Sequence, residues 1–195
     1  MLVGSHPRRV AVVGGARIPF ARAHGAYASV GNQEMLTASI KAVVDKFGLH
    51  GMRLGDVIAG AVMKHSSQWN LARESLLDSG LAPDTPGLDV QRACGTSIEA
   101  AIAIANKIAL GQIDAGIAAG VDTVSDPPIV FGKAYQQLML RAFRAKSAGE
   151  RVKAFLGLRP RHFKPHYPGT GEPRTGLSMG QHAEKMAREW QITRE

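Results

Sequence analysis

A strongly apolar stretch over residues 98–110 restricts the possible folds more than any other part of the chain. Its sequence, IEAAIAIANKIAL, places isoleucine, leucine or alanine on almost every side of a helix. A helix with that pattern is buried all round. Residues 89–91 before it and the apolar run at 115–121 after it read as strands. A buried helix between two strands requires structural layers on both faces of a sheet.

The rest of the first 125 residues continues this alternation. Apolar runs at 9–14 and 56–62 predict two further buried strands. Apolar residues at helical spacing predict a helix over 32–47, which Asn32 would cap, and a shorter helix over 70–79. Four strands alternating with helices predict an α/β fold with a parallel sheet.

Charge divides the chain near residues 126–131. Residues 1–132 carry 11 Lys/Arg and 11 Asp/Glu, whereas residues 133–195 carry 13 and 5 and hold the entire net charge of +8. We therefore expect two domains, residues 1–125 and 126–195. The basic second part predicts an anionic partner, for which a phosphate group is one candidate.

Local patterns in the second part predict mostly helix and loop. Residues 134–151 read as a basic helical stretch, and prolines at 160, 165 and 168 argue against regular structure around them. Residues 179–190 read as a helix in which Glu184 and Arg188 pair. Thr193 reads as a new helix cap at the point where the sequence stops, so we expect an N-terminal part of a longer protein.

Cys94 is the only cysteine and occupies a place suited to a nucleophile. A tight turn joins the strand at 89–91 to the apolar helix, and the spacing of Thr96 and Glu99 predicts a capping box with Thr96 as the N-cap. Cys94 would then lie just before the first helical turn, where free N–H groups and the helix dipole favour the reactive thiolate. A buried cysteine acting as a small apolar residue is the alternative.

Four segments in order resemble the thiolase family. Together they extend over nearly the whole chain, and the chain is similar to the N-terminal half of the acetyl-CoA acetyltransferases of that family. The segments are 17–20 (RIPF), 90–97 (VQRACGTS), 120–128 (GVDTVSDPP) and 176–184 (GLSMGQHAE).

Three departures from the family pattern accompany these matches. Gln91 stands where the family usually has Asn, and Asp122 replaces the more usual Glu. Thr96 and Ser97 replace the commoner Ser-Gly pair. These changes bear on substrate preference.

The resemblance implies a layered α-β-α-β-α fold, of which this chain would form the N-terminal half with part of the loop domain. It implies an acyltransferase of fatty-acid or acetoacetyl-CoA metabolism, in which Cys94 accepts an acyl group from acetyl-CoA or another acyl-CoA. Ser178 and Met179 match positions that contact CoA and line the acyl pocket. The family's catalytic histidine motif and second cysteine do not occur in the sequence. A homo-oligomer, dimer or tetramer, is also implied.

Several other classes are not expected. No histidine has metal-site spacing, so we predict no metal and no cofactor beyond CoA esters as substrates. Aromatic residues make up 6% of the chain and no groove-reading motif occurs, which argues against nucleic acid. No apolar run reaches the roughly 18–20 residues that span a bilayer, so no membrane partner is expected. The single cysteine and the lack of a signal core in residues 1–9 predict a cytoplasmic protein.

Two alternative functions remain open. A ketoacyl synthase shares the fold and the cysteine nucleophile, although the RIPF segment and the basic second part favour a thiolase. An inactive subunit that only associates with other chains is the second alternative.

Overall fold

The computed structural model describes residues 7–167, 169 and 171–195, and it divides into two compact units, Met1–Pro127 and Pro128–Glu195. The six residues at the N-terminus, which include part of the region searched for a signal core, lie outside the described residues, as does Pro168.

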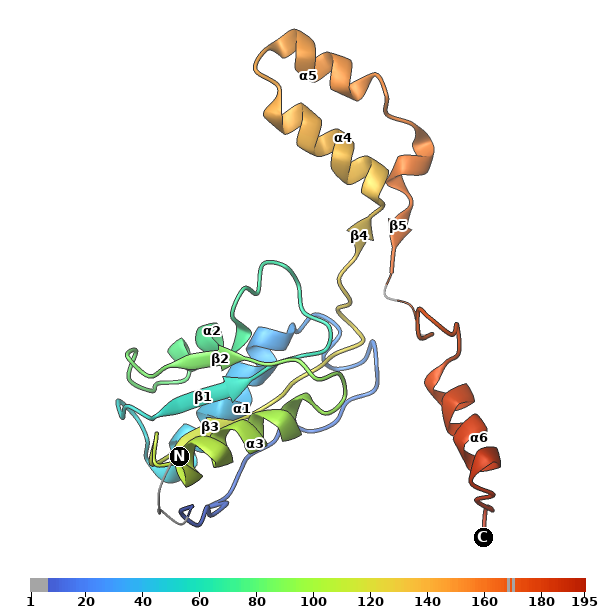
Figure 1. The fold of residues 1–195 in the computed structure, drawn as a ribbon. Coiled ribbons are helices and arrows are strands. Elements are labelled where there is room, and N and C mark those ends of the chain that lie inside the picture. The colour runs from blue at the N-terminus through green and yellow to red at the C-terminus, as the bar shows by residue number, and fades with distance from the viewer. Residues whose placement is uncertain (1–6, 168, 170) are drawn as a thin grey trace, which may run out of the picture. The chain divides into compact units, whose positions relative to one another are not determined.

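The first unit is built on a parallel sheet of three strands in the order β2-β1-β3. The strands are β1 (Asp56–Ala59), β2 (Gly87–Asp89) and β3 (Gly116–Ala118), and β1 pairs with both of the others. Helices alternate with them along the chain, as Figure 1 shows. They are α1 (Asn32–Phe47), α2 (Leu71–Leu77) and α3 (Thr96–Ala109). The predicted α/β class with a parallel sheet is confirmed.

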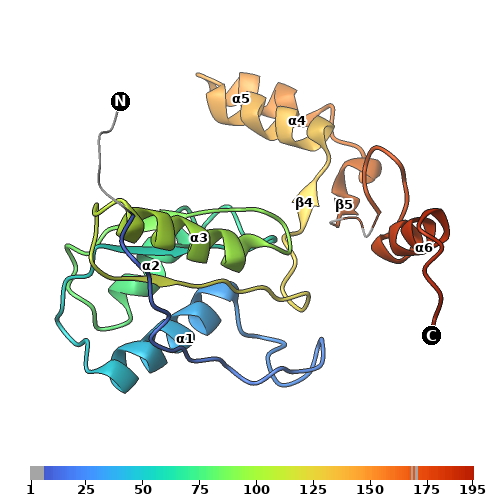
Figure 2. The same ribbon diagram turned by 60° about the horizontal axis from the view of Figure 1, so that its bottom comes forward.

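Helices cover both faces of this sheet, as Figure 2 shows from a second direction. Val57 and Ala59 belong to a buried cluster with side chains of α1 and α2, whereas Ile58 packs with Ala100 and Ile104 of α3. This division follows from the strand itself, because successive side chains point to opposite faces. Every residue of β1 is therefore buried.

Helix α1 has the predicted bounds but a different cap. Gly31 is the N-cap, and its N–H donates to the Glu34 side chain at 2.8 Å. Asn32, predicted as the cap, is instead buried, and its side-chain amide donates to the carbonyl of Met63. At the other end Gly48 adopts the left-handed conformation (φ 63°), as the glycine predicted.

Two predictions of burial in the first unit are wrong. Residues 9–14 form no strand and join no ladder of the sheet, and Val12 is 95% exposed. Helix α3 is not buried all round. Its Ala100 and Ile104 face the sheet, but Ile98 is 67% exposed, because no described element packs against that side of the helix.

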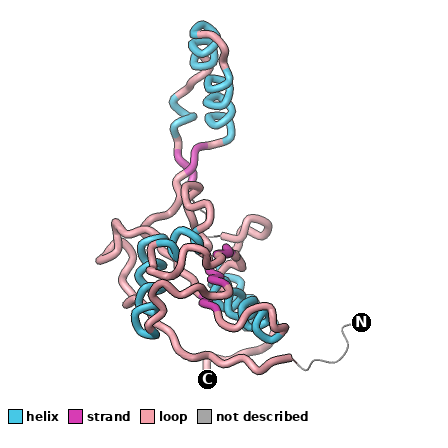
Figure 3. The backbone as a smooth tube through the Cα atoms, turned by 90° about the vertical axis from the view of Figure 1, so that its left-hand side faces the viewer, coloured by secondary structure: helices cyan, strands magenta, loops and turns pink. Residues whose placement is uncertain are grey.

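The second unit consists of short elements. The predicted helix over 134–151 is two helices, α4 (Lys133–Arg144) and α5 (Ala148–Phe155), because the chain turns to an extended conformation at Ala145 and Ser147 caps a new helix. Strands β4 (Val130–Phe131) and β5 (Pro165–His166) pair antiparallel and stand side by side at the base of these helices (Figure 3).

The remaining elements are η1 (Pro160–Phe163) and α6 (Met179–Glu189). The expectation that the prolines exclude regular structure is thus wrong for 160–166, since a proline opens η1 in the first-turn position that suits it. The predicted pair of Glu184 and Arg188 is confirmed at 2.7 Å.

Basic residues concentrate in one segment of this unit. Residues 128–167 hold nine Lys/Arg and a single acidic residue, Glu150, whereas residues 168–195 hold four of each sign. The whole net charge of the chain therefore belongs to the segment from β4 to β5.

Candidate active site

Cys94 is exposed on a tight turn between β2 and α3. Two backbone hydrogen bonds close the turn, from the N–H of Gly95 to the carbonyl of Arg92 (2.9 Å) and from the N–H of Thr96 to the carbonyl of Ala93 (3.2 Å). The helix begins at Thr96, two residues after the thiol. The cysteine therefore lies where the predicted nucleophile was expected, and the alternative of a buried cysteine is excluded.

The residue before the thiol has an uncommon backbone conformation. Ala93 has φ 42°, a value that residues with a side chain rarely adopt and that occurs often at functional sites. The buried Thr96 side chain holds the turn in this shape, because its hydroxyl accepts from the N–H of Arg92 (2.9 Å) and donates to the carbonyl of Ala93 (2.7 Å). These two hydrogen bonds offset the strain of the Ala93 backbone next to the thiol.

This use of Thr96 corrects the predicted capping box. Gly95 is the N-cap of α3, and Thr96 is already inside the helix with its hydroxyl committed to the turn. The Glu99 carboxylate does not reach back to a cap residue and instead pairs with the Arg92 guanidinium at 2.5 Å. The pair bridges the turn and the first helical turn.

Two glycines allow the strand ends to approach this turn. A Cβ atom on Gly60, which follows β1, would lie 1.9 Å from the carbonyl oxygen of Val90 and 3.0 Å from the Thr96 side chain. A Cβ atom on Gly120, which follows β3, would lie 2.8 Å from the Ser97 side chain. Only glycine fits at either place, so the turn rests directly on the backbone of β1 and β3.

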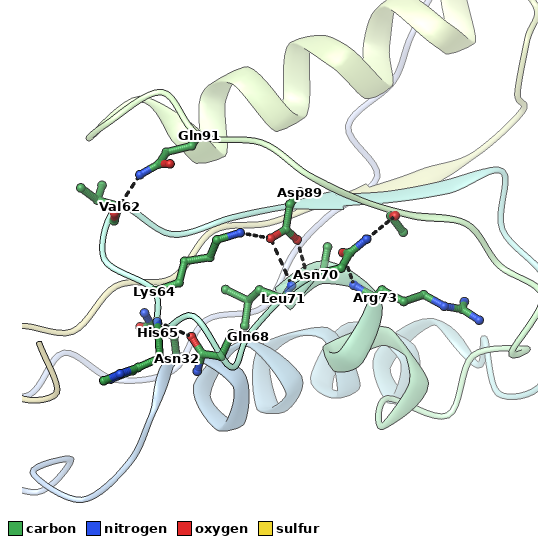
Figure 4. A network of polar contacts seen from close by, with 12 residues as sticks. Asn32, Val62, Lys64, His65, Gln68, Asn70, Leu71, Arg73, Asp89 and Gln91 are labelled. Atoms are coloured by element: carbon green, nitrogen blue, oxygen red, sulfur yellow. Dashed lines mark hydrogen bonds and ion pairs between the residues drawn. The ribbon is translucent and has the colours of Figure 1, made fainter. Parts of the chain in front are cut away.

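A polar network fixes the loop from β1 to α2 beside the turn, as Figure 4 shows. The Asp89 carboxylate at the end of β2 accepts from the N–H groups of Leu71 (3.1 Å) and Ala72 (2.7 Å) and pairs with Lys64. A carboxylate at a helix N-terminus is favoured by the free N–H groups and the dipole. The strand that leads to Cys94 is thereby tied to α2.

Sequence reasoning did not find Asp89, Lys64 or the role of Asn32. Lys64 and Asp89 are 25 residues apart, and no spacing rule connects a loop lysine with a carboxylate at the end of a different strand. The available signal was weaker: an acidic residue in a predicted strand, and a predicted helix start at Asn70. Contacts of this kind become visible only once the sheet order is known.

Ser178 and Met179 belong to the second unit, whereas Cys94 belongs to the first. Ser178 is the N-cap of α6: its hydroxyl accepts from the N–H of Gln181 (3.2 Å), and its own N–H donates to the Gln181 side chain (2.7 Å). Met179 opens the helix and is 72% exposed. Their contact with CoA stays a prediction.

The turn before α6 contains the group with the clearest change in acidity. The Thr175 hydroxyl, and then the backbone N–H groups of Arg174 and Thr175, hydrogen-bond the Glu172 carboxylate and hold its pKa below the usual value. The backbone bonds measure 3.1 and 2.8 Å. The carboxylate organises the turn from Glu172 to Leu177.

The described residues contain neither a cluster suited to a metal ion nor a helix suited to a bilayer. No group of three or more His, Cys, Asp and Glu side chains within them could hold a metal ion. Within the same part of the chain, no helix has the length and apolar character to cross a membrane.

Comparisons with known proteins agree on one family. The family model described as "Thiolase, N-terminal domain" matches residues 10–195. A 3-ketoacyl-CoA thiolase of Serratia proteamaculans is 34% identical over 194 residues, which cover 100% of this chain and 44% of that protein. A 3-ketoacyl-CoA thiolase of Erwinia tasmaniensis is 35% identical, over 96% of this chain and 43% of its own.

The fold agrees as well. The crystal structure of the Bacillus anthracis acetyl-CoA acetyltransferase superposes with a TM-score of 0.71 at 21% identity, over 94% of this chain and 42% of that one. The chain belongs to the thiolase family, and its fold is the thiolase-like α/β fold predicted from the sequence. It spans somewhat less than half the length of the curated relatives it matches.

Proposed function

We propose that this chain carries the nucleophile of a thiolase, an enzyme that transfers an acyl group between an active-site cysteine and CoA or acyl-CoA. One observation carries the proposal. The only cysteine of a thiolase-family chain is exposed on a strained turn at the entrance of α3. A buried or loosely held thiol would not support it.

The first chemical step follows from this geometry. The Cys94 thiolate attacks the carbonyl carbon of an acyl-CoA thioester, and a tetrahedral oxyanion forms. The carbon–sulfur bond to CoA then breaks, CoA leaves as a thiolate that takes a proton from water, and the acyl group stays on Cys94. The backbone N–H of Cys94, at the helix entrance, is the donor that we assign to the oxyanion on this side of the site.

The second unit supplies CoA contacts in this proposal. We assign residues 126–195 to part of the loop domain, with Ser178 and Met179 against CoA. The excess of Lys and Arg supports the assignment, because these side chains bind phosphate groups well. Assembly into a homo-oligomer and a cytoplasmic location belong to the same proposal.

The test is the intact mass of the purified chain before and after incubation with acetyl-CoA. We expect one acetyl adduct on the parent chain and none on Cys94→Ala. Acylation is expected to be slow, because no family histidine motif accompanies the thiol in this sequence. An adduct that persists in Cys94→Ala, or a folded parent chain that never gains mass, contradicts the proposal.

The two alternatives give different results in related assays. A ketoacyl synthase would accept acyl groups from a carrier protein in preference to CoA. A subunit that only associates with other chains would show no protection of Cys94 from alkylation when CoA is added. The exposed side of α3 is the observation that favours association, since exposed apolar surface often marks an interface.

A further inference from the structure

In the Val62–His65 loop, every residue takes part in a hydrogen bond or an ion pair with another part of the first unit. It follows β1 and precedes α2, and Figure 4 shows side chains from several elements converging on it. Lys64 pairs with Asp89, and the His65 ring lies 3.1 Å from the Asp126 carboxylate. A loop without regular structure is usually mobile, whereas these contacts fix the position of this one. The contacts therefore point to a loop whose position matters.

Two side chains bind opposite sides of Val62. The Asp122 carboxylate accepts from the N–H groups of Val62 (2.7 Å) and Met63 (3.1 Å). The Gln91 side-chain amide donates to the Val62 carbonyl (2.8 Å). Asp122 follows β3 and Gln91 follows β2, so the loop at the end of the central strand is held from both neighbouring strands.

The buried Asn32 completes this arrangement. Its amide donates to the Met63 carbonyl, so the backbone groups of two successive residues, Val62 and Met63, bind to three side chains from distant parts of the sequence. Asn32 is nearly fully buried, whereas Gln91 and Asp122 are exposed. Asn32 therefore anchors the loop, and the two exposed side chains are free to adjust its position.

The held loop adjoins the Cys94 turn. Gln91 lies three residues before Cys94, and Gly60, two residues before Val62, is in contact with Val90 and Thr96. A displacement of Val62 along the Asp122–Gln91 direction therefore changes the surface next to the thiol.

The lengths of the Gln91 and Asp122 side chains limit where the loop can lie between β2 and β3, because each bond forms only within hydrogen-bond distance. Glutamine is one methylene longer than asparagine, and aspartate is one methylene shorter than glutamate. A lost methylene draws the loop toward β3 by about 1.5 Å, the length of one carbon–carbon bond. An added methylene lets the amide follow it from β2.

We propose that Gln91 and Asp122 are a matched pair of positioning residues that sets the place of the Val62–His65 loop and, through it, the acyl group that Cys94 accepts. The coupling of the two side chains stands on the contacts alone. Its effect on acyl preference rests on the proposed function.

A double-mutant cycle tests the coupling with Gln91→Asn, Asp122→Glu and the double variant in the full chain. The readout is amide hydrogen exchange at Val62 and Met63. Each single variant should speed exchange about fivefold, which corresponds to the loss of one hydrogen bond of about 1 kcal/mol. The double variant should return to within about twofold of the parent, since both bonds re-form with the loop displaced. Effects that simply multiply in the double variant would overturn the pairing.

The matched control makes the same two exchanges elsewhere in the first unit. Gln112→Asn and Asp78→Glu change exposed residues near the ends of α3 and α2. These variants should leave exchange at Val62 unchanged, singly and together. A similar acceleration in the controls would show a general loss of stability in place of a local one.

A second readout separates the pairing from the proposed function. The relative rates of Cys94 acylation by acetyl-CoA and hexanoyl-CoA, followed by intact mass, should shift in the double variant while its exchange at Val62 stays near that of the parent. A recovered exchange rate with an unchanged ratio would overturn the role in acyl preference. Absence of acylation in every variant, the parent included, would contradict the proposed function, and the exchange cycle would still decide the pairing.

Discussion

Strand β1 of the first unit is buried at every residue, whereas helices α5 and α6 of the second unit contain no buried residue. Among the described residues of the second unit, the buried apolar side chains are Leu138 and Ala142, both in α4. The first unit is thus stabilised by a core, and the second mainly by caps, turns and short ladders. The difference shows that one chain can combine a part with a large apolar core and a part that depends on local hydrogen bonds.

The largest effect should come from the core of the first unit. Leu76→Ala removes a fully buried side chain from the cluster between α1, α2 and the sheet, and it should lower the free energy of unfolding by about 2–5 kcal/mol. Urea denaturation followed by circular dichroism measures it. Leu77→Ala, at the exposed neighbouring position, is the control and should cost less than about 1 kcal/mol. Equal losses would mean that the core is not packed as described.

The next effect concerns the glycine under the Cys94 turn. Gly60→Ala places a methyl group against the Val90 carbonyl and should cost about 3 kcal/mol through overpacking, with a changed rate of Cys94 alkylation. Thermal unfolding and iodoacetamide kinetics measure the two effects. Gly15→Ala, where no atom lies within 4 Å of the new methyl group, should change neither.

A smaller and more local effect is expected in the second unit. Leu138→Ala removes one of its few buried side chains and should cost about 2 kcal/mol, the low end for leucine, because little surrounding core is left to disturb. Native-state hydrogen exchange should show faster exchange in α4 and α5 and no change in β1. The exposed Leu140 provides the control, Leu140→Ala. Destabilisation that spreads equally to β1 would break the distinction between the two units.

The smallest effect is a pH dependence of the turn before α6. Folding lowers the pKa of Glu172 below its usual value, so the charged form stabilises the turn at pH values above that usual pKa. The contribution should be lost as pH falls through the lower, folded-state pKa. An NMR titration of the Thr175 amide should follow this loss, and Glu172→Gln should abolish the titration. An unchanged profile in Glu172→Gln would assign the transition to another group.

Sequence patterns predicted best those elements whose signals are local. Helix α1 followed from its periodicity and from Gly48, and α6 from its i, i+4 pair, because residues within a few turns of each other determine these features. Residues 9–14 have the composition of a strand, but a strand also needs a partner with which it forms a ladder, and composition does not identify one. The capping box at Thr96 failed for a related reason, since the same hydroxyl was needed by the turn.

The residues of the candidate site also divide into those that local patterns predict and those that only the folded structure reveals. The place of Cys94 before a helix could be predicted from the strand–turn–helix pattern. Asp89, Lys64 and the two bonds to Val62 could not, because they join residues that are brought together only by the order of the strands. The contact of Ser178 and Met179 with CoA stays a prediction.

The concentration of positive charge between β4 and β5 has a consequence for folding equilibria. Like charges such as Arg141 and Arg144 lie one helical turn apart, and their repulsion opposes formation of the α4–α5 hairpin. Dissolved salt weakens that repulsion, since the Debye length shortens to about 8 Å at physiological ionic strength. The hairpin should therefore become more stable as salt is added, and a balanced set of charges leaves the first unit with no comparable dependence. A change in ionic strength should thus alter the stability of the second unit more than that of the first.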